Sequence, residues 1–194
     1  MDYTKIGTLI YKLRKEKNMT QKQLADAMNL SDRTISKWER GLGCPDISLL
    51  IQLSELLNVN IKEILSGDLI SNEFVGGNMK NTKYYVCPLC GNITLSTGNA
   101  VISCCSRVLE ELVPKKATDK EKLNVEIVED EWFISSEHSM TKDHYISFLA
   151  FATGDKIQII KQYPEWNIQT RISKRGHGML LWYCTKHGLF YQLI

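Results

Sequence analysis

Apolar residues recur at helical spacing in the first third of the chain. The first such set consists of Ile6, Leu9, Ile10 and Leu13. Residues three or four positions apart lie on the same face of a helix. The pattern therefore predicts an amphipathic helix over residues 4–17.

Four further helices are predicted after it. Thr20 and Ser31 stand where the second and third helices would begin, and their hydroxyls can accept hydrogen bonds from the free amides of a helix N-terminus. Gly41 would end the third helix, and Pro45-Asp46 would open a fourth. A short fifth helix is expected over residues 61–65.

Beyond about residue 84, helical spacing gives way to short runs typical of β-strands. The apolar residues Leu123, Val125 and Ile127 occupy every second position, as in a strand with one buried face. Further strands are predicted at residues 145–151, 156–162, 179–184 and 189–194. Several short strands separated by turns predict a β-sandwich of the immunoglobulin-like kind.

This change of pattern predicts a multidomain protein of the α plus β class. A five-helix domain is assigned to residues 1–67, and a linker to residues 68–83, where glycine and asparagine replace the helical spacing. A small cysteine ribbon is assigned to residues 84–106 and the β-sandwich to residues 107–194. The helical and β regions are therefore expected to have separate functions.

Composition adds a few constraints. Hydrophobic residues make up 43% of the 194 residues, enough for a packed core, and the net charge is only +2. Any contact with nucleic acid must therefore come from a local basic patch. No apolar run approaches the ~20 residues of a membrane helix, and the N-terminal residues form no apolar signal core. We expect a cytoplasmic protein whose six cysteines are metal ligands or reduced thiols rather than disulfides.

The second and third predicted helices are joined by a tight turn at residues 29–30. Such a pair is a helix-turn-helix unit, whose second helix lies in the DNA major groove. The sequence over residues 4–66 resembles the Cro/repressor, or xenobiotic-response-element, family of regulators. Several positions carry the resemblance at once, namely Gln21 and Ala25, Ile35 and Trp38, and Glu39-Arg40-Gly41.

The resemblance implies roles for polar residues of this unit. Base edges would be read by Asp32, Arg33, Ser36 and Lys37. Phosphates would be contacted, or the reading residues braced, by Gln21, Lys22, Thr34 and Arg40, with Ser31 at the same surface. Further basic charge near the duplex would come from Lys12, Arg14, Lys15 and Lys17. Double-stranded DNA is thus the expected partner, and half-sites about one duplex turn apart favour a homodimer. These residues could instead form solvated helix faces or a protein-binding surface.

Cysteines at ligand spacing occur in the ribbon. Cys87-x2-Cys90 places two thiolates on one turn, and the vicinal pair Cys104-Cys105 would supply two more. Four thiolates in a tetrahedron suit zinc or a single iron. A zinc ribbon ordinarily uses two Cys-x2-Cys knuckles. Two vicinal cysteines on one metal are unusual, because consecutive side chains of a strand point apart. The sequence resembles the iron site of desulforedoxin, which implies iron here, with zinc as the alternative.

A second ligand set follows in the β-sandwich and consists of His138, His144, Cys184 and His187. The sequence around these residues resembles the catalytic domain of desulfoferrodoxin, a superoxide reductase, and residues 84–194 follow that two-centre family in order. The resemblance implies that the imidazoles hold iron in a plane. Cys184 would bind from one side, leaving the opposite position open for superoxide. The histidines could instead be unrelated surface or core residues.

One ligand of that family is missing. Its remaining histidine follows a Glu-Lys pair, which this chain keeps as Glu121-Lys122, but the next residue is Leu123. Leucine cannot coordinate a metal. The resemblance nevertheless implies that Glu121 and Lys122 are catalytic if the chain reduces superoxide, with Lys122 attracting the anion. The site could bind iron with an open equatorial position, prefer tetrahedral zinc, or bind weakly. His177, in a glycine-flanked loop, could act as a substitute or remain a surface histidine.

Together these patterns predict a transcriptional regulator. The helical domain would bind a promoter, and the iron-bearing region would sense superoxide, related oxidants or iron supply. The alternative is an enzyme, a superoxide reductase that carries a DNA-binding domain, and the loss of one histidine leaves that activity open. A third possibility is a regulator whose metal sites are purely structural zinc.

Overall fold

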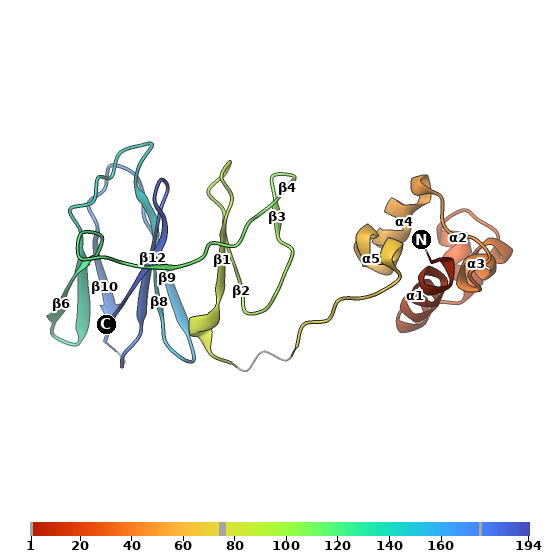
Figure 1. Cartoon of the computed structure of the whole chain (residues 1–194), viewed down its shortest axis with the longest axis horizontal. Helices are drawn as coiled ribbons and strands as arrows, with labels where there is room; N and C mark the ends of the chain where they lie inside the picture. Colours follow the sequence, from red (N-terminus) through yellow and green to blue (C-terminus); the bar gives the residue numbers. More distant parts are fainter. Residues whose placement is uncertain (1, 74–76, 175) are drawn as a thin grey trace. The chain divides into compact units, whose positions relative to one another are not determined.

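The computed structural model describes residues 2–73, 77–174 and 176–194. The chain divides into two compact units, Met1–Ser71 and Asn72–Ile194. The first unit holds five helices and the second is built from strands (Figure 1), so the predicted α and β regions are confirmed. Residues 74–76 of the predicted linker lie outside the described residues.

The five helices have the bounds α1 (Tyr3–Glu16), α2 (Gln21–Ala27), α3 (Asp32–Glu39), α4 (Ile47–Leu57) and α5 (Ile61–Ser66). Local hydrogen bonds explain where they begin. The Thr20 hydroxyl accepts from the amide of Gln23, whose side chain accepts in turn from the Thr20 amide, which forms a capping box. The Ser31 hydroxyl caps α3 by accepting from the amide of Thr34. Both predicted caps are present.

One apolar core joins the five helices. Each helix contributes a fully buried side chain to it, namely Ile10, Leu24, Ile35, Leu53 and Ile64. Helices α1 and α3 approach so closely that a Cβ on Gly7 would lie 2.1 Å from the Trp38 carbonyl oxygen. Because glycine has no Cβ, Gly7 allows α3 to pack directly against α1.

The second unit begins with a short 3₁₀ helix, η1 (Met79–Asn81), which falls within the predicted linker. Its strands are β1 (Lys83–Val86), β2 (Ile93–Ser96), β3 (Ser103–Cys104), β4 (Arg107–Val108), β5 (Lys115–Lys116), β6 (Asn124–Val128), β7 (Glu131–Ser135), β8 (Ile146–Ala152), β9 (Ile157–Lys161), β10 (Gln169–Ser173), β11 (Met179–Cys184) and β12 (Gly188–Leu193). The β3–β4 hairpin extends to Val108, past the predicted ribbon boundary at residue 106.

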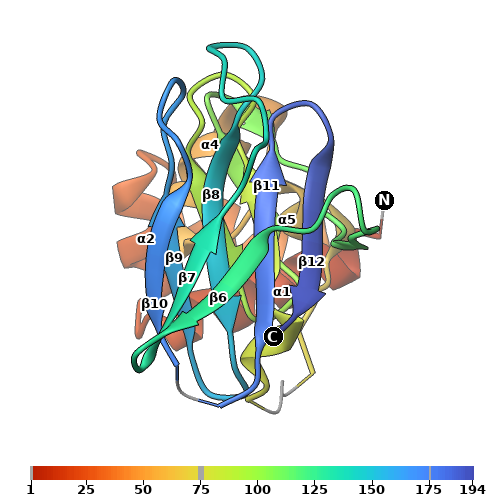
Figure 2. The ribbon, with the colours of Figure 1, turned by 90° about the vertical axis from the view of Figure 1, so that its left-hand side faces the viewer.

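Two sheets enclose the main core of this unit. One has the strand order β10-β7-β6 and the other β5-β12-β11-β8-β9, and Figure 2 shows the smaller sheet lying across the larger one. Ile134 and Ile172 from the small sheet pack with Leu149, Phe151 and Leu180 from the large one. This arrangement is a two-layer sandwich, while the immunoglobulin-like topology stays a prediction.

The hairpin of β1 and β2 packs on the outer face of the larger sheet (Figure 1). Tyr84 stacks on Phe148 with ring centroids 6.1 Å apart, and Leu181 and Leu189 belong to the same buried cluster. The cysteine ribbon is therefore attached to the sandwich through an apolar interface.

Among the described residues, no helix combines the length and the apolar character that crossing a bilayer would require.

Candidate metal centres and nucleic-acid interface

The turn between β1 and β2 carries the first two cysteines. Gly91 has a φ of +66°, which lets the chain reverse so that the Gly91 amide donates to the Cys87 carbonyl over 2.9 Å. The backbone amides of Cys90 and Leu89 donate to the Cys87 sulfur and lower the pKa of this thiol to about 6. The thiolate is the form that binds metals, so this turn prepares Cys87 as a ligand.

A second hairpin brings Cys104 and Cys105 to the same point. β3 ends at Cys104 and β4 begins at Arg107, so Cys105 and Ser106 form a two-residue turn. Both have positive φ, 49° and 60°, as in a type I′ turn. Consecutive side chains point apart only while both residues are in a strand. Because Cys105 has left the strand, its sulfur lies 4.0 Å from that of Cys104.

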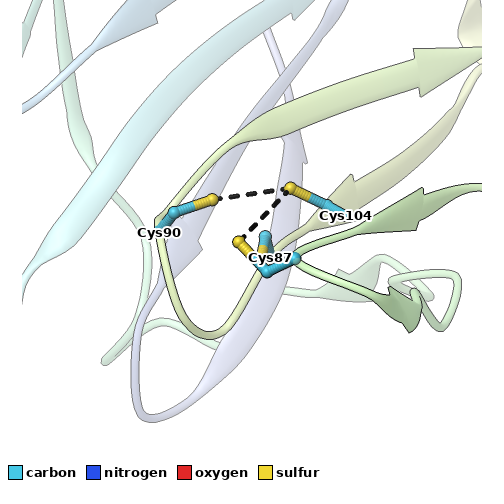
Figure 3. A group of neighbouring side chains, drawn as sticks. Cys87, Cys90 and Cys104 are labelled. Carbon is cyan, nitrogen blue, oxygen red and sulfur yellow. Dashed lines mark hydrogen bonds between the residues drawn. The ribbon is translucent and has the colours of Figure 1, made fainter.

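The four sulfur atoms form a compact cluster. All lie within 4.8 Å of one another, and those of Cys90 and Cys104 are 3.5 Å apart (Figure 3). A tetrahedron of metal–sulfur bonds near 2.3 Å would place its sulfurs about 3.8 Å apart. A disulfide would require about 2.05 Å, and all four cysteines are free. The spacing therefore fits a tetrathiolate metal site.

The second cluster is assembled from two connections in the sandwich, β7–β8 and β11–β12. His138 and His144 lie between β7 and β8, Cys184 ends β11, and His187 precedes β12. The β8–β11 register shifts between Tyr183 and Cys184, and such a bulge re-aims the side chain that follows it. All four candidate ligand atoms lie within 4.8 Å of one another.

The histidine nitrogens in this cluster fit metal ligation. Both ring nitrogens of His138 and Nε2 of His144 are buried without a hydrogen-bond partner among the described residues. Burial is the main cause that lowers the pKa of both histidines, which favours the neutral, metal-binding form. Cys184 Sγ lies 3.5 Å from Nδ1 of His187. Since unpartnered buried polar atoms are rare in proteins, a bound metal accounts for them well.

A cavity of about 350 Å³ adjoins this cluster, and Glu121, Lys122 and Leu123 contribute to its wall. The Glu121 carboxylate accepts from the amide and the hydroxyl of Thr118, at 2.9 and 2.8 Å. Lys122 forms a 2.7 Å ion pair with Asp119. A catalytic role for Glu121 and Lys122 stays a prediction. His177 is exposed and lies outside both clusters in the part of the chain that the structure describes.

Helix α3 has a buried and an exposed face. Ile35 and Trp38 point into the helical core, whereas Asp32, Arg33 and Lys37 are exposed. Residues that read base edges need this exposure, and the base-reading role of the three residues stays a prediction.

The remaining predicted DNA-contact residues differ in their surroundings. The Ser31 and Thr34 hydroxyls are 2.9 Å apart at the start of α3, and Arg40 Nε donates to the Ser36 carbonyl. Lys22 is exposed. Gln21 instead donates to the Glu39 carboxylate over 2.8 Å, which makes it a brace between α2 and α3.

Arg14 is expected from the sequence to supply basic charge near the duplex, but its side chain is buried. Its side chain and that of Glu39 are each only 4% exposed and form an ion pair. The sequence pattern carried a signal for this burial, because Arg14 lies four residues after Ile10 on the apolar face of α1.

Comparison with known proteins identifies the helical domain. The family model for the helix-turn-helix matches residues 10–64. The same region is 44% identical over 59 residues to the HTH-type transcriptional activator BcrR of Enterococcus faecalis, covering 30% of this chain and 29% of that protein. It is 31% identical over 68 residues to the regulator ImmR of Bacillus subtilis, covering 35% and 54%. The chain thus spans only 29% and 54% of the lengths of these two relatives.

The β region has different relatives. It is 25% identical over 122 residues to a desulfoferrodoxin homolog of Methanothermobacter thermautotrophicus, covering 58% of this chain and 98% of that protein. The superoxide reductase of Treponema pallidum has the same coverage, with a TM-score of 0.51 and 19% identity, which supports the fold alone. The chain therefore combines a helix-turn-helix domain similar to those of transcriptional regulators with a desulfoferrodoxin-like domain. Both resemblances seen in the sequence are confirmed.

Proposed function

We propose that this protein is a transcriptional regulator whose affinity for its promoter depends on the state of two metal centres. The observation that carries the proposal is their co-occurrence with a helix-turn-helix domain. Two four-residue clusters of Cys and His ligands, each within 4.8 Å, follow that domain in one chain. A change in metal charge or occupancy at such ligands alters local geometry, which can then bias how the DNA-binding domains are held.

Iron is the metal that we propose for both centres, with zinc as the alternative. Cys87, Cys90, Cys104 and Cys105 would hold one ion, and His138, His144, Cys184 and His187 the other. Iron would supply one-electron exchange, which zinc does not. The effector would be superoxide, a related oxidant or iron supply. We also propose a cytoplasmic homodimer, because two recognition helices about one duplex turn apart, ~34 Å, require two chains in register.

Arg33→Ala is expected to weaken operator binding by about 1–3 kcal/mol, because the forked guanidinium on α3 would be lost from a base edge. Arg33→Lys keeps the charge but not the fork and should also lose discrimination. The measurement is electrophoretic or fluorescence titration with an operator selected from random duplexes. Lys62→Ala, on the exposed surface of α5, is the control. Equal losses in Arg33→Ala and Lys62→Ala would contradict the assignment of α3 as the reading helix.

The metal dependence has a separate test. Promoter affinity is measured for reduced, oxidised and metal-free protein, after metal analysis and visible spectra have identified the bound ions. We expect the three affinities to differ, because metal loss frees buried histidine nitrogens and crowded thiolates. Identical affinities would exclude sensing through the metals. Colourless zinc protein with unchanged affinity would favour purely structural sites.

An enzyme remains the alternative, and the cavity beside the His/Cys cluster is the observation in its favour. In that case the chain would reduce superoxide, with Lys122 attracting the anion to the cavity. Superoxide reduction by the iron-loaded protein that disappears in Cys184→Ser would support this function.

A further inference from the structure

The three histidine rings of the second cluster occupy three corners of a square. The ring centroids of His138 and His144 are 4.6 Å apart, and those of His144 and His187 are 4.7 Å apart. The third separation, between His138 and His187, is 6.1 Å. This is about 1.3 times the other two, close to the ~1.4 of a square's diagonal and unlike the equal spacing of tetrahedral donors. The side chains thus leave one corner of the square, opposite His144, without an imidazole.

The cavity lies on the side of that corner. His138, Cys184 and His187 all belong to its wall, whereas His144 is absent from the described residues that line it. Since His144 stands between the other two rings, a cavity that touches those two and not His144 opens at the opposite corner. Leu123 also lines the cavity, and its side chain offers no donor atom.

Leu123 is held in this place by the fold. Its amide donates to Gln192 Oε1 over 3.0 Å, and its carbonyl accepts from Gln192 Nε2 over 3.1 Å. Its side chain is 4% exposed and packs in the same buried cluster as Trp182 and Cys184. The segment therefore cannot turn another residue toward the corner without breaking these contacts.

We propose that the cavity beside Leu123 binds a small external Lewis base, which would donate to the metal held by His138, His144, Cys184 and His187 from the corner that lacks an imidazole. The inference rests on the proposed function, in which the His/Cys cluster holds iron. The cavity wall combines the apolar side chains of Leu123, Trp182 and Phe190 with charged residues that include Glu121 and Lys122. A compact donor of a few atoms, neutral or singly charged, suits this lining. The volume of about 350 Å³ exceeds the ~30 Å³ share of one water molecule, so such a donor fits. Binding at this corner would let a small molecule change the ligands of the metal, in addition to any change in the metal's oxidation state.

The test is an azide titration of the iron-loaded, oxidised full-length protein, followed by visible difference spectra and electron paramagnetic resonance. The four-cysteine centre is common to all variants, so its contribution cancels in the comparison. Four donors on a six-coordinate ion leave two positions, and we expect the wild-type protein to bind azide in two steps. Leu123→His supplies the missing imidazole and should show one step only.

Two further variants separate the donor effect from misfolding. Leu123→Phe fills the cavity without adding a donor and should also lose the second azide-binding step. Leu123→Val neither fills the cavity nor adds a donor, and it should retain both binding steps. The same number of steps with the same midpoints in wild type, Leu123→His and Leu123→Phe would overturn the inference. If metal analysis finds no iron at the His/Cys cluster of the wild type, both the inference and the proposed metal at this centre fail. Iron present with identical titrations overturns the inference alone.

Discussion

Replacing Glu39 by alanine is expected to lower the free energy of unfolding of the helical domain by about 3–5 kcal/mol. The Glu39 and Arg14 side chains are each 4% exposed and form an ion pair. Removing the carboxylate leaves the guanidinium buried without its charge partner. Such an uncompensated charge is among the few causes of large destabilisation by one substitution.

Hydrogen bonds around this pair connect three helices. Arg14 Nη2 donates to Glu39 over 2.9 Å, and Gln21 donates to the same carboxylate oxygen over 2.8 Å. Arg14 Nη1 donates to the Met19 carbonyl between α1 and α2. The hydrogen bond with Glu39 is also the main cause that raises the pKa of Arg14. Because α3 carries the expected base-reading residues, loss of this network should also reduce operator binding.

Denaturant titration followed by helical circular dichroism measures the effect. Glu55→Ala is the matched control, since Glu55 is exposed on α4, and its change should stay within about 0.5 kcal/mol. A double variant, Arg14→Met with Glu39→Leu, removes both charges and should recover much of the lost stability. Equal stability of Glu39→Ala and Glu55→Ala would show that the pair does not stabilise the domain.

Replacing Cys104 by alanine is expected to abolish metal binding at the four-cysteine centre and to unfold the ribbon locally. The ribbon has little core of its own, because its buried cluster holds only Tyr85, Cys87 and Leu109 among the described residues. Structural zinc contributes about 10–16 kcal/mol of binding free energy to small metal-dependent folds. A metal bound by the four cysteines would therefore replace the core that these short strands lack.

Metal analysis of Cys104→Ala should show the loss of one ion per chain, with the His/Cys centre still occupied. Hydrogen exchange should rise in β3 and β4 and remain unchanged in β8 and β11, whose residues belong to the buried cores of the sandwich. Cys44→Ser is the control, since Cys44 belongs to neither cluster within the described chain. Full metal content in Cys104→Ala would refute the four-cysteine site.

The helical domain follows closely from local sequence. Apolar spacing predicts the five helices, and Thr20 and Ser31 mark the starts of α2 and α3 because capping bonds span only three residues. Two strands of the small sheet, β7 and β10, are absent from the prediction. β7 places three apolar residues in succession. Burial alternates along β10, but one of its two buried positions is the polar Thr170, so the apolar pattern of neither strand shows simple alternation.

The sequence by itself determined the helix and strand classes, the capped helix starts and the identity of both groups of potential ligands, because these depend on spacing along the chain. Only the tertiary structure decided how the ligands meet. It placed Cys105 in a turn where its sulfur reaches that of Cys104, buried Arg14 against Glu39, and set Leu123 beside three of the four donors of the His/Cys cluster. These outcomes depend on contacts between residues far apart in the chain, which pattern and propensity along one segment do not specify.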